Sequence, residues 1–199
     1  MKDSPSTQDQ NWIDAGAVCV MPYYGPWSWM NNETVDFVDE LVECVRREYG
    51  LISANPLIAT GGSMGGYAAL EYAIASKLSV TACFANCPVC DLAALYTERP
   101  DVPRTLHHAF GSYCDISAAL KAHSPLQQVD QLPNIPYLIV HGAEDSSVTK
   151  ATHSDRLAAA MRNRGLALEY VQVAGMGHCG PLSDEIVAQI ECFVASGLI

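Results

Sequence analysis

The chain has 199 residues, of which 49% are hydrophobic, and its formal net charge is −11 at pH 7. This length suits one core, so we expect residues 1–199 to form a single domain. A surface this negative repels phosphate backbones and anionic lipid, which argues against nucleic-acid and membrane partners. No apolar run approaches the roughly 18 residues that a membrane-spanning helix needs. The polar segment Met1 to Asn11 lacks the apolar core of a signal peptide, so we expect a cytoplasmic protein.

Strand-like and helix-like segments alternate along the chain. Short apolar runs predict buried strands at residues 17–21, 57–60, 80–85, 137–141 and 168–173. Helical patterns cover residues 10–15, 32–49, 67–75, 152–163 and 184–195. Asn31 or Asn32 can cap the second of these helices, and Gly50 can end it. The alternation predicts an α/β fold with a mainly parallel sheet and helices on both faces.

Residues 87–136 break this rhythm and are rich in Pro, His and Leu. We expect residues 91–136 to form short helices over the sheet edge at which the strands end. In open α/β sheets that edge is where ligands bind.

The segment Gly61 to Gly65 (GGSMG) matches the pattern G-x-S-x-G. In such a turn from strand to helix, the serine is held in a strained conformation that exposes its hydroxyl at the sheet edge. The alternative is an ordinary glycine-rich turn. The strand-like run before it and the apolar helical run after it favour Ser63 as a nucleophile.

A serine hydroxyl needs a base to act as a nucleophile at neutral pH. Of six histidines, His178 stands out, because it lies in a glycine-flanked loop between the last strand and the last helix. The third member should follow a strand at the same edge, and HGAEDSSV follows the run at 137–141. Asp145 lies deeper in that turn than Glu144, which remains the second choice. His141 fits a structural role better than that of a base. The order Ser63, Asp145, His178 is that of α/β-hydrolases.

Six segments together resemble the catalytic domain of the prolyl oligopeptidase family, which includes dipeptidyl-peptidase and acylaminoacyl-peptidase relatives. They are GGSMGGYAAL, NCPVCDL, FGSYCD, SPLQQV, PYLIVHGAEDSSV and GMGHCG, between Leu57 and Gly180. The resemblance places Ser63, Asp145 and His178 at the positions of the catalytic triad. Esterases and dienelactone-hydrolase-like enzymes share most of these segments, so serine hydrolysis is implied more firmly than peptide hydrolysis.

The resemblance also shows what this sequence lacks. Relatives carry an earlier strand whose loop donates part of the oxyanion hole, and no such strand precedes Asn11. We therefore expect residues 1–199 to lack the first strands of the fold and the β-propeller of the peptidases. The backbone N–H of Met64 can supply one oxyanion donor, and Tyr23 or Tyr24 could supply a second through its hydroxyl. Trp27 and Trp29 could line a substrate pocket, although they could equally pack the loop onto the core.

The eight cysteines read mostly as small buried hydrophobes in a reducing compartment. Cys87 and Cys90 have CxxC spacing, but no second pair of ligands accompanies them, so we expect no metal and no cofactor.

The favoured hypothesis is therefore a serine hydrolase that cleaves a small peptide or an ester through an acyl-enzyme on Ser63. The alternative of the same fold is a carboxylesterase. A different alternative is a non-catalytic or partner-completed remnant, in which an exposed sheet edge pairs with another chain, such as a second copy. A redox or metal protein that uses Cys87 and Cys90 is the weakest hypothesis.

Overall fold

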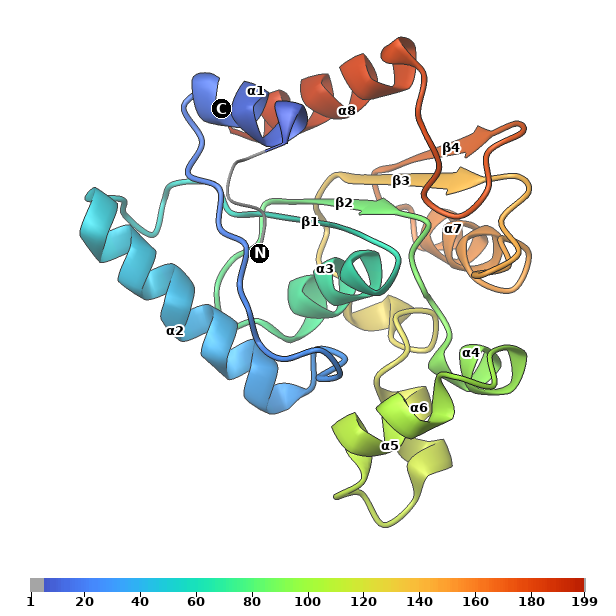
Figure 1. The fold of residues 1–199 in the computed structure, drawn as a ribbon. Coiled ribbons are helices and arrows are strands. Elements are labelled where there is room, and N and C mark those ends of the chain that lie inside the picture. The colour runs from blue at the N-terminus through green and yellow to red at the C-terminus, as the bar shows by residue number, and fades with distance from the viewer. Residues whose placement is uncertain (1–5, 199) are drawn as a thin grey trace.

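The computed structural model describes residues 6–198, and its centre is a four-stranded sheet in the order β1-β2-β3-β4. The strands are β1 (Ile58–Gly62), β2 (Ala82–Asn86), β3 (Tyr137–Gly142) and β4 (Leu168–Val173). Every neighbouring pair is parallel, as the sequence predicts. All four strands therefore end at the same edge of the sheet, where the loops with Ser63, Asp145 and His178 begin (Figure 1).

Helices connect and cover the strands (Figure 1). They are α1 (Thr7–Asp14), α2 (Asn32–Tyr49), α3 (Met64–Ala75), α4 (Leu92–Glu98), α5 (Pro103–Phe110), α6 (Ile116–Ala122), α7 (Ser154–Asn163) and α8 (Asp184–Gly197), with a 3-10 turn η1 at Val129–Gln131. In the described part of the chain, none of the helices combines the length and the apolar character that crossing a bilayer requires.

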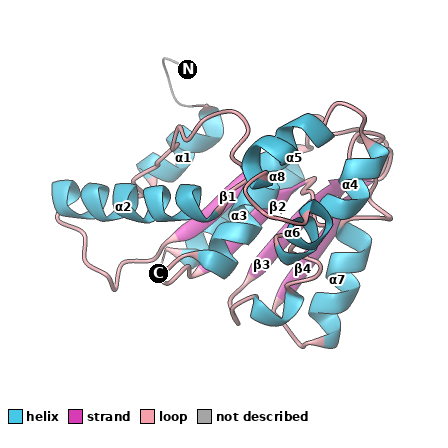
Figure 2. Cartoon of the chain, turned by 90° about the horizontal axis from the view of Figure 1, so that it is seen from below, coloured by secondary structure: helices cyan, strands magenta, loops and turns pink. Residues whose placement is uncertain are grey.

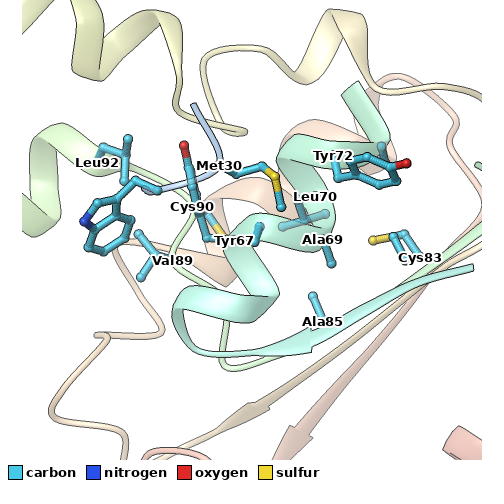
Figure 3. Close-up of a cluster of buried hydrophobic side chains, with 14 of the residues drawn as sticks. Met30, Tyr67, Ala69, Leu70, Tyr72, Cys83, Ala85, Val89, Cys90 and Leu92 are labelled. Atoms are coloured by element: carbon cyan, nitrogen blue, oxygen red, sulfur yellow. The ribbon is translucent and has the colours of Figure 1, made fainter. Parts of the chain in front are cut away.

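The side chains of the strands alternate between two hydrophobic clusters, one on each face of the sheet. On one face, Cys83 and Ala85 of β2 pack beneath α3 (Figure 3), in a cluster that also contains residues of α2 and α7. On the other face, Ala82 and Phe84 pack against α8, with Trp12 of α1 beside them. Figure 2 views the molecule from below, with α2, α3 and α7 on the near side of the strands. Helices thus cover both faces, which confirms the expected α/β architecture.

Helix α2 begins and ends as its sequence predicts. The side chain of Asn31 accepts a hydrogen bond from the N–H of Thr34, and Gly50 ends the helix with a φ of 65°. Val35, Val38 and Val42 face the core, whereas Tyr49 in the last turn is 63% exposed. Arg46 is buried in the last turn instead, where it pairs with Glu43 at 2.8 Å.

The strand expected at residues 17–21 does not form. Its backbone is irregular, and Val18, Val20 and Met21 are 38%, 37% and 70% exposed. A strand requires a neighbour for its backbone hydrogen bonds, and no described strand lies beside this segment. Strand β1 pairs only with β2 within residues 6–198, so its other edge is open.

All eight cysteines lie among the described residues and are free thiols, as the sequence suggested. The expectation that most are buried is wrong. Cys83, Cys87 and Cys90 are buried, whereas the five others are exposed, because they lie on outward faces of helices or in loops. The prediction that Cys19 is buried fails together with the strand that was to hold it.

A buried polar cluster fixes the helical segment 91–136 against α3. The Glu71 carboxylate of α3 contacts Nδ1 of His123 at 3.2 Å and accepts a hydrogen bond from Nε2 of Gln128 at 2.8 Å. Burial raises the pKa of Glu71, against the opposing effect of its hydrogen bonds to His123 and Gln128. Tyr113 bonds the second ring nitrogen of His123 at 2.8 Å, and Phe110 stacks on its ring. One carboxylate thus ties this segment to the helix that begins directly after Ser63.

We predict that Glu71→Ala lowers the free energy of unfolding by about 1–3 kcal/mol, because it leaves buried groups of His123 and Gln128 without their partner. Urea denaturation followed by circular dichroism measures the change. Glu48→Ala, at an exposed position of α2, is the matched control and should shift stability by less than about 0.5 kcal/mol. Equal midpoints for the two variants would contradict the structural role of Glu71.

Candidate active site

Ser63 lies in the turn between β1 and α3 in a backbone conformation that few side chains adopt. Its φ is 57° and its ψ is −121°, and its N–H donates to the carbonyl of Asn86 at 2.8 Å. Any side chain at Gly61 would collide with the backbone of Gly65, so the turn needs glycine there. The strain and the half-exposed side chain match the geometry expected of a nucleophile in this motif.

His178 lies in the loop between β4 and α8 and bridges the two other predicted residues. Its Nε2 is 2.7 Å from Oγ of Ser63, and its Nδ1 is 2.7 Å from Oδ2 of Asp145. The carboxylate can only accept, so we assign the proton of the neutral ring to Nδ1. Nε2 then accepts the hydrogen bond of the Ser63 hydroxyl. The structure thus brings together three side chains that span residues 63 to 178.

Asp145 is buried and is fixed by the turn that it begins. Its Oδ1 accepts hydrogen bonds from the N–H groups of Ser147 and Val148, both at 2.9 Å. Burial alone would raise the pKa of Asp145, but the Val148 N–H, His178 and the Ser147 N–H stabilise the carboxylate more, and its pKa lies below the usual range. Glu144 is exposed, so Asp145 is the acid that reaches His178.

His141 lies at the end of β3 as a fully buried support for Asp145. Its Nδ1 is 2.6 Å from the Ser154 hydroxyl, and its Nε2 is 2.9 Å from the Val148 carbonyl and 3.2 Å from Asp145. Burial lowers the pKa of His141, although the Val148 carbonyl and Asp145 act in the opposite direction. A neutral ring that donates from Nε2 satisfies these contacts and suits a structural role.

Two cysteines from distant parts of the sequence meet beside His178. The N–H of Cys179 donates to Sγ of Cys87 at 3.3 Å, and both residues have a positive φ, 48° and 47°. The Cys179 thiol donates to the carbonyl of Asn86 at 3.7 Å. The neighbouring Cys179 side chain lowers the pKa of Cys87 to about 7, and Cys87 in turn raises the pKa of Cys179. Cys90 takes no part, because it lies in the hydrophobic cluster on the opposite face of the sheet (Figure 3).

The oxyanion donors are only partly accounted for. Met64 is the first residue of α3, directly after Ser63, so its N–H is not used within the helix. Tyr23 is 78% exposed, and Tyr24 packs against the core on the α3 side. Neither hydroxyl makes a hydrogen bond to another residue in the range 6–198. A role for either tyrosine as second donor stays a prediction.

The two tryptophans differ in their surroundings. Trp29 is 5% exposed, its indole donates to Oγ1 of Thr105 at 2.9 Å, and its ring packs edge-on against Tyr67. These contacts favour the packing alternative for Trp29. Trp27 is 47% exposed and lines a hollow of about 380 Å³ near the start of α2. Ser63, Asp145 and His178 do not line that hollow, so a substrate-pocket role for Trp27 stays a prediction.

Two features of the site were missed in the sequence. The backbone hydrogen bonds of Asp145 could have been found, because Asp followed by small polar residues is typical of a turn in which the side chain accepts nearby N–H groups. The meeting of Cys87 and Cys179 had no such signal, since the two residues are 92 positions apart.

The comparison with known protein families covers the part of the chain that holds the sheet and the site. Residues 27–194 match the sequence profile of the prolyl oligopeptidase family. The chain belongs to the prolyl oligopeptidase family. No curated protein sequence matches it.

Solved structures of low identity share the fold. A puromycin-hydrolyzing peptidase of Mycobacterium tuberculosis aligns with a TM-score of 0.70 at 20% identity over 86% of this chain and 26% of that one. The acylaminoacyl peptidase of Pyrococcus horikoshii aligns with a TM-score of 0.61 at 16% identity, over 75% and 25%. A truncated carbohydrate esterase from gut microbiota aligns with a TM-score of 0.63 at 16% identity, over 83% and 67%. This prolyl oligopeptidase family chain thus spans about a quarter of the length of the two peptidases.

Proposed function

We propose that this chain is a serine hydrolase that cleaves a small peptide or an ester through an acyl-enzyme on Ser63. The observation that carries the proposal is the continuous set of short hydrogen bonds from Ser63 through His178 to Asp145, both 2.7 Å long. Family membership supports the same chemistry.

In the proposed reaction, Oγ of Ser63 attacks the carbonyl carbon of the substrate while Nε2 of His178 accepts the hydroxyl proton. The N–H of Met64 donates to the oxyanion that forms. His178 then gives its proton to the leaving amine or alcohol, which departs and leaves the acyl group on Ser63. A water molecule, deprotonated by His178, releases the acid and restores Ser63. Asp145 holds the tautomer and stabilises the imidazolium in both steps.

The preferred substrate class is a peptide, because two of the similar structures are peptidases. An ester is the alternative substrate, and the similarity to a carbohydrate esterase favours it. Turnover of matched acyl-amide and acyl-ester substrates would separate the two. In either case we propose that the substrate is small and that neither a membrane nor nucleic acid is a partner.

One observation favours a second function, that of a subunit completed by another chain. The open edge of β1 adjoins the turn of Ser63, and one oxyanion donor is unassigned. An unpaired strand edge can accept a strand from another molecule, including a second copy of this chain. In that case the protein alone would not react with a fluorophosphonate probe. The eight free thiols support a reducing, cytoplasmic setting for either function.

We predict that wild-type protein is labelled by a fluorophosphonate and hydrolyses a p-nitrophenyl acyl ester, and that Ser63→Ala loses both. Thermal unfolding should be nearly unchanged in the variant, because the hydroxyl is half-exposed. Ser146→Ala, at an exposed position, is the matched control and should keep both properties. Retention of more than a few per cent of the activity in Ser63→Ala would refute Ser63 as nucleophile.

Asp145→Asn should lower kcat by orders of magnitude, roughly 10⁴ in the best-studied triad. An asparagine can keep the hydrogen bonds from Ser147 and Val148, but its amide favours the wrong tautomer of His178. Glu144→Gln is the control, and steady-state kinetics should show little change, since Glu144 is exposed. If Glu144→Gln shows the larger loss, the acid has been assigned to the wrong carboxylate.

The pH dependence of kcat/KM should show an acid limb that reflects a single proton. His178 must be neutral to accept the Ser63 proton, so activity is present above the limb and is lost as the pH falls. Because the pKa of Asp145 is held below its usual range, this carboxylate stays ionised across the limb. A plot of log kcat/KM against pH in metal-free buffer should have a slope of one. A slope of two would mean that a second group titrates in the same range, and would contradict the single-proton expectation.

A further inference from the structure

A second set of reactive side chains lies against the proposed catalytic residues. Sγ of Cys87, Sγ of Cys179 and a ring nitrogen of His178 all lie within 4.8 Å of one another. The mechanism proposed above uses neither thiol. We propose that Cys87, Cys179 and His178 form a binding site for a soft divalent metal ion, Zn²⁺ first among them, and that the bound ion stops hydrolysis. The second half of this proposal rests on the proposed function, whereas the first half does not.

The donor set suits Zn²⁺ in kind and in spacing. Two thiolates and one imidazole are ligands that Zn²⁺ prefers, and three protein ligands leave a fourth position for water. Zn–S bonds of about 2.3 Å and Zn–N bonds of about 2.0–2.1 Å place tetrahedral donors roughly 3.5–3.8 Å apart. Donors that already lie within 4.8 Å need to close by little more than about 1 Å.

The three residues also provide a route for the ion. Cys87 is buried at the base of the site, His178 is half-buried, and Cys179 is exposed. An ion can therefore bind at Cys179 first and then contact the two other donors. The N–H of Cys179 donates to Sγ of Cys87 and so orients this sulfur toward the site.

Occupation of the site removes His178 from the proposed chemistry, whichever ring nitrogen binds the ion. Coordination through Nε2 would replace the hydrogen bond from Ser63, and coordination through Nδ1 would replace the one to Asp145. In the first case no base remains for Ser63, and in the second the orientation of the ring is lost. The ion would therefore act as an inhibitor, and it would displace whatever protons the two thiols still carry when it binds.

The spacing Cys87-Pro-Val-Cys90 does not provide this site. Sγ of Cys90 contacts the carbonyl of Pro88 and the hydroxyl of Ser154, in the hydrophobic cluster on the α3 side. Cys87 belongs to the cluster on the opposite side of the sheet. The partner of Cys87 is thus Cys179, which only the fold brings close.

The test measures Zn²⁺ affinity by competition with a chromogenic chelator, in a phosphine reductant that keeps the thiols reduced. Wild-type protein should bind one Zn²⁺, and Cys87→Ser, Cys179→Ala and His178→Gln should each bind more weakly. Loss of an outer-shell partner already costs roughly 10–100-fold in affinity, so loss of a ligand should cost at least as much. Cys114→Ser removes an exposed thiol elsewhere and should bind as the wild type does. Equal affinities for the wild type and the three ligand variants would overturn the proposal.

Two further readouts keep the test decisive if a variant fails to fold or the enzyme is inactive. In wild-type protein, Zn²⁺ should slow the alkylation of Cys179 by iodoacetamide, as measured by peptide mass analysis, and leave that of Cys114 unchanged. Equal effects on the two exposed thiols would refute the site. Ser63→Ala should bind Zn²⁺ as tightly as the wild type, because Ser63 is not a ligand. Binding by this variant shows that the metal site stands even if the proposed hydrolysis does not.

Discussion

The hydrogen bond from the N–H of Ser63 to the carbonyl of Asn86 continues the parallel β1–β2 pairing one residue past the end of β1. This bond fixes Ser63 in a strained turn with a positive φ, and α3 begins at the next residue. The strain costs of order 1–3 kcal/mol and persists only because the surrounding structure holds it. The two hydrophobic clusters contribute to that support, because they bury the strands β1 and β2 on which the turn of Ser63 depends.

The parallel arrangement has a second consequence, which concerns the loops after β2, β3 and β4. Because all strands end at one edge, Cys87, Asp145 and His178 come together although each belongs to a different loop. Gly142 permits the close approach of two of these loops, since a side chain there would collide with the carbonyls of Met176 and Gly177. The same geometry therefore produces both the hydrogen bonds of His178 and the pair of thiols beside it.

The free edge of β1 lies beside the turn of Ser63, so it bears on which groups could donate hydrogen bonds at the site. Residues 17–21 are apolar and form no strand, residues 18–21 are exposed, and β1 has one partner in the described part of the chain. In the proposed mechanism, an N–H donor from that side would complement Met64 at the oxyanion, and the loss of one such donor typically costs roughly 10²–10³ in rate. Slow turnover of the isolated chain would thus be compatible with intact geometry at Ser63, His178 and Asp145.

The sequence by itself determined the four strands of the sheet and the bounds of α2, and it indicated that Ser63, Asp145 and His178 would meet at one edge of the sheet. These inferences succeeded because they depend on local signals: apolar runs, a capping asparagine, a glycine-rich turn and the position of each loop after a strand. Prediction from the sequence failed at residues 17–21. The local pattern there favours a strand, but strand pairing depends on a neighbour that the described chain does not provide. Tertiary structure alone decided that Trp29 packs in the core and that Cys87 meets Cys179 rather than Cys90. Such contacts join residues far apart in sequence, and their geometry exists only once strands and helices have packed.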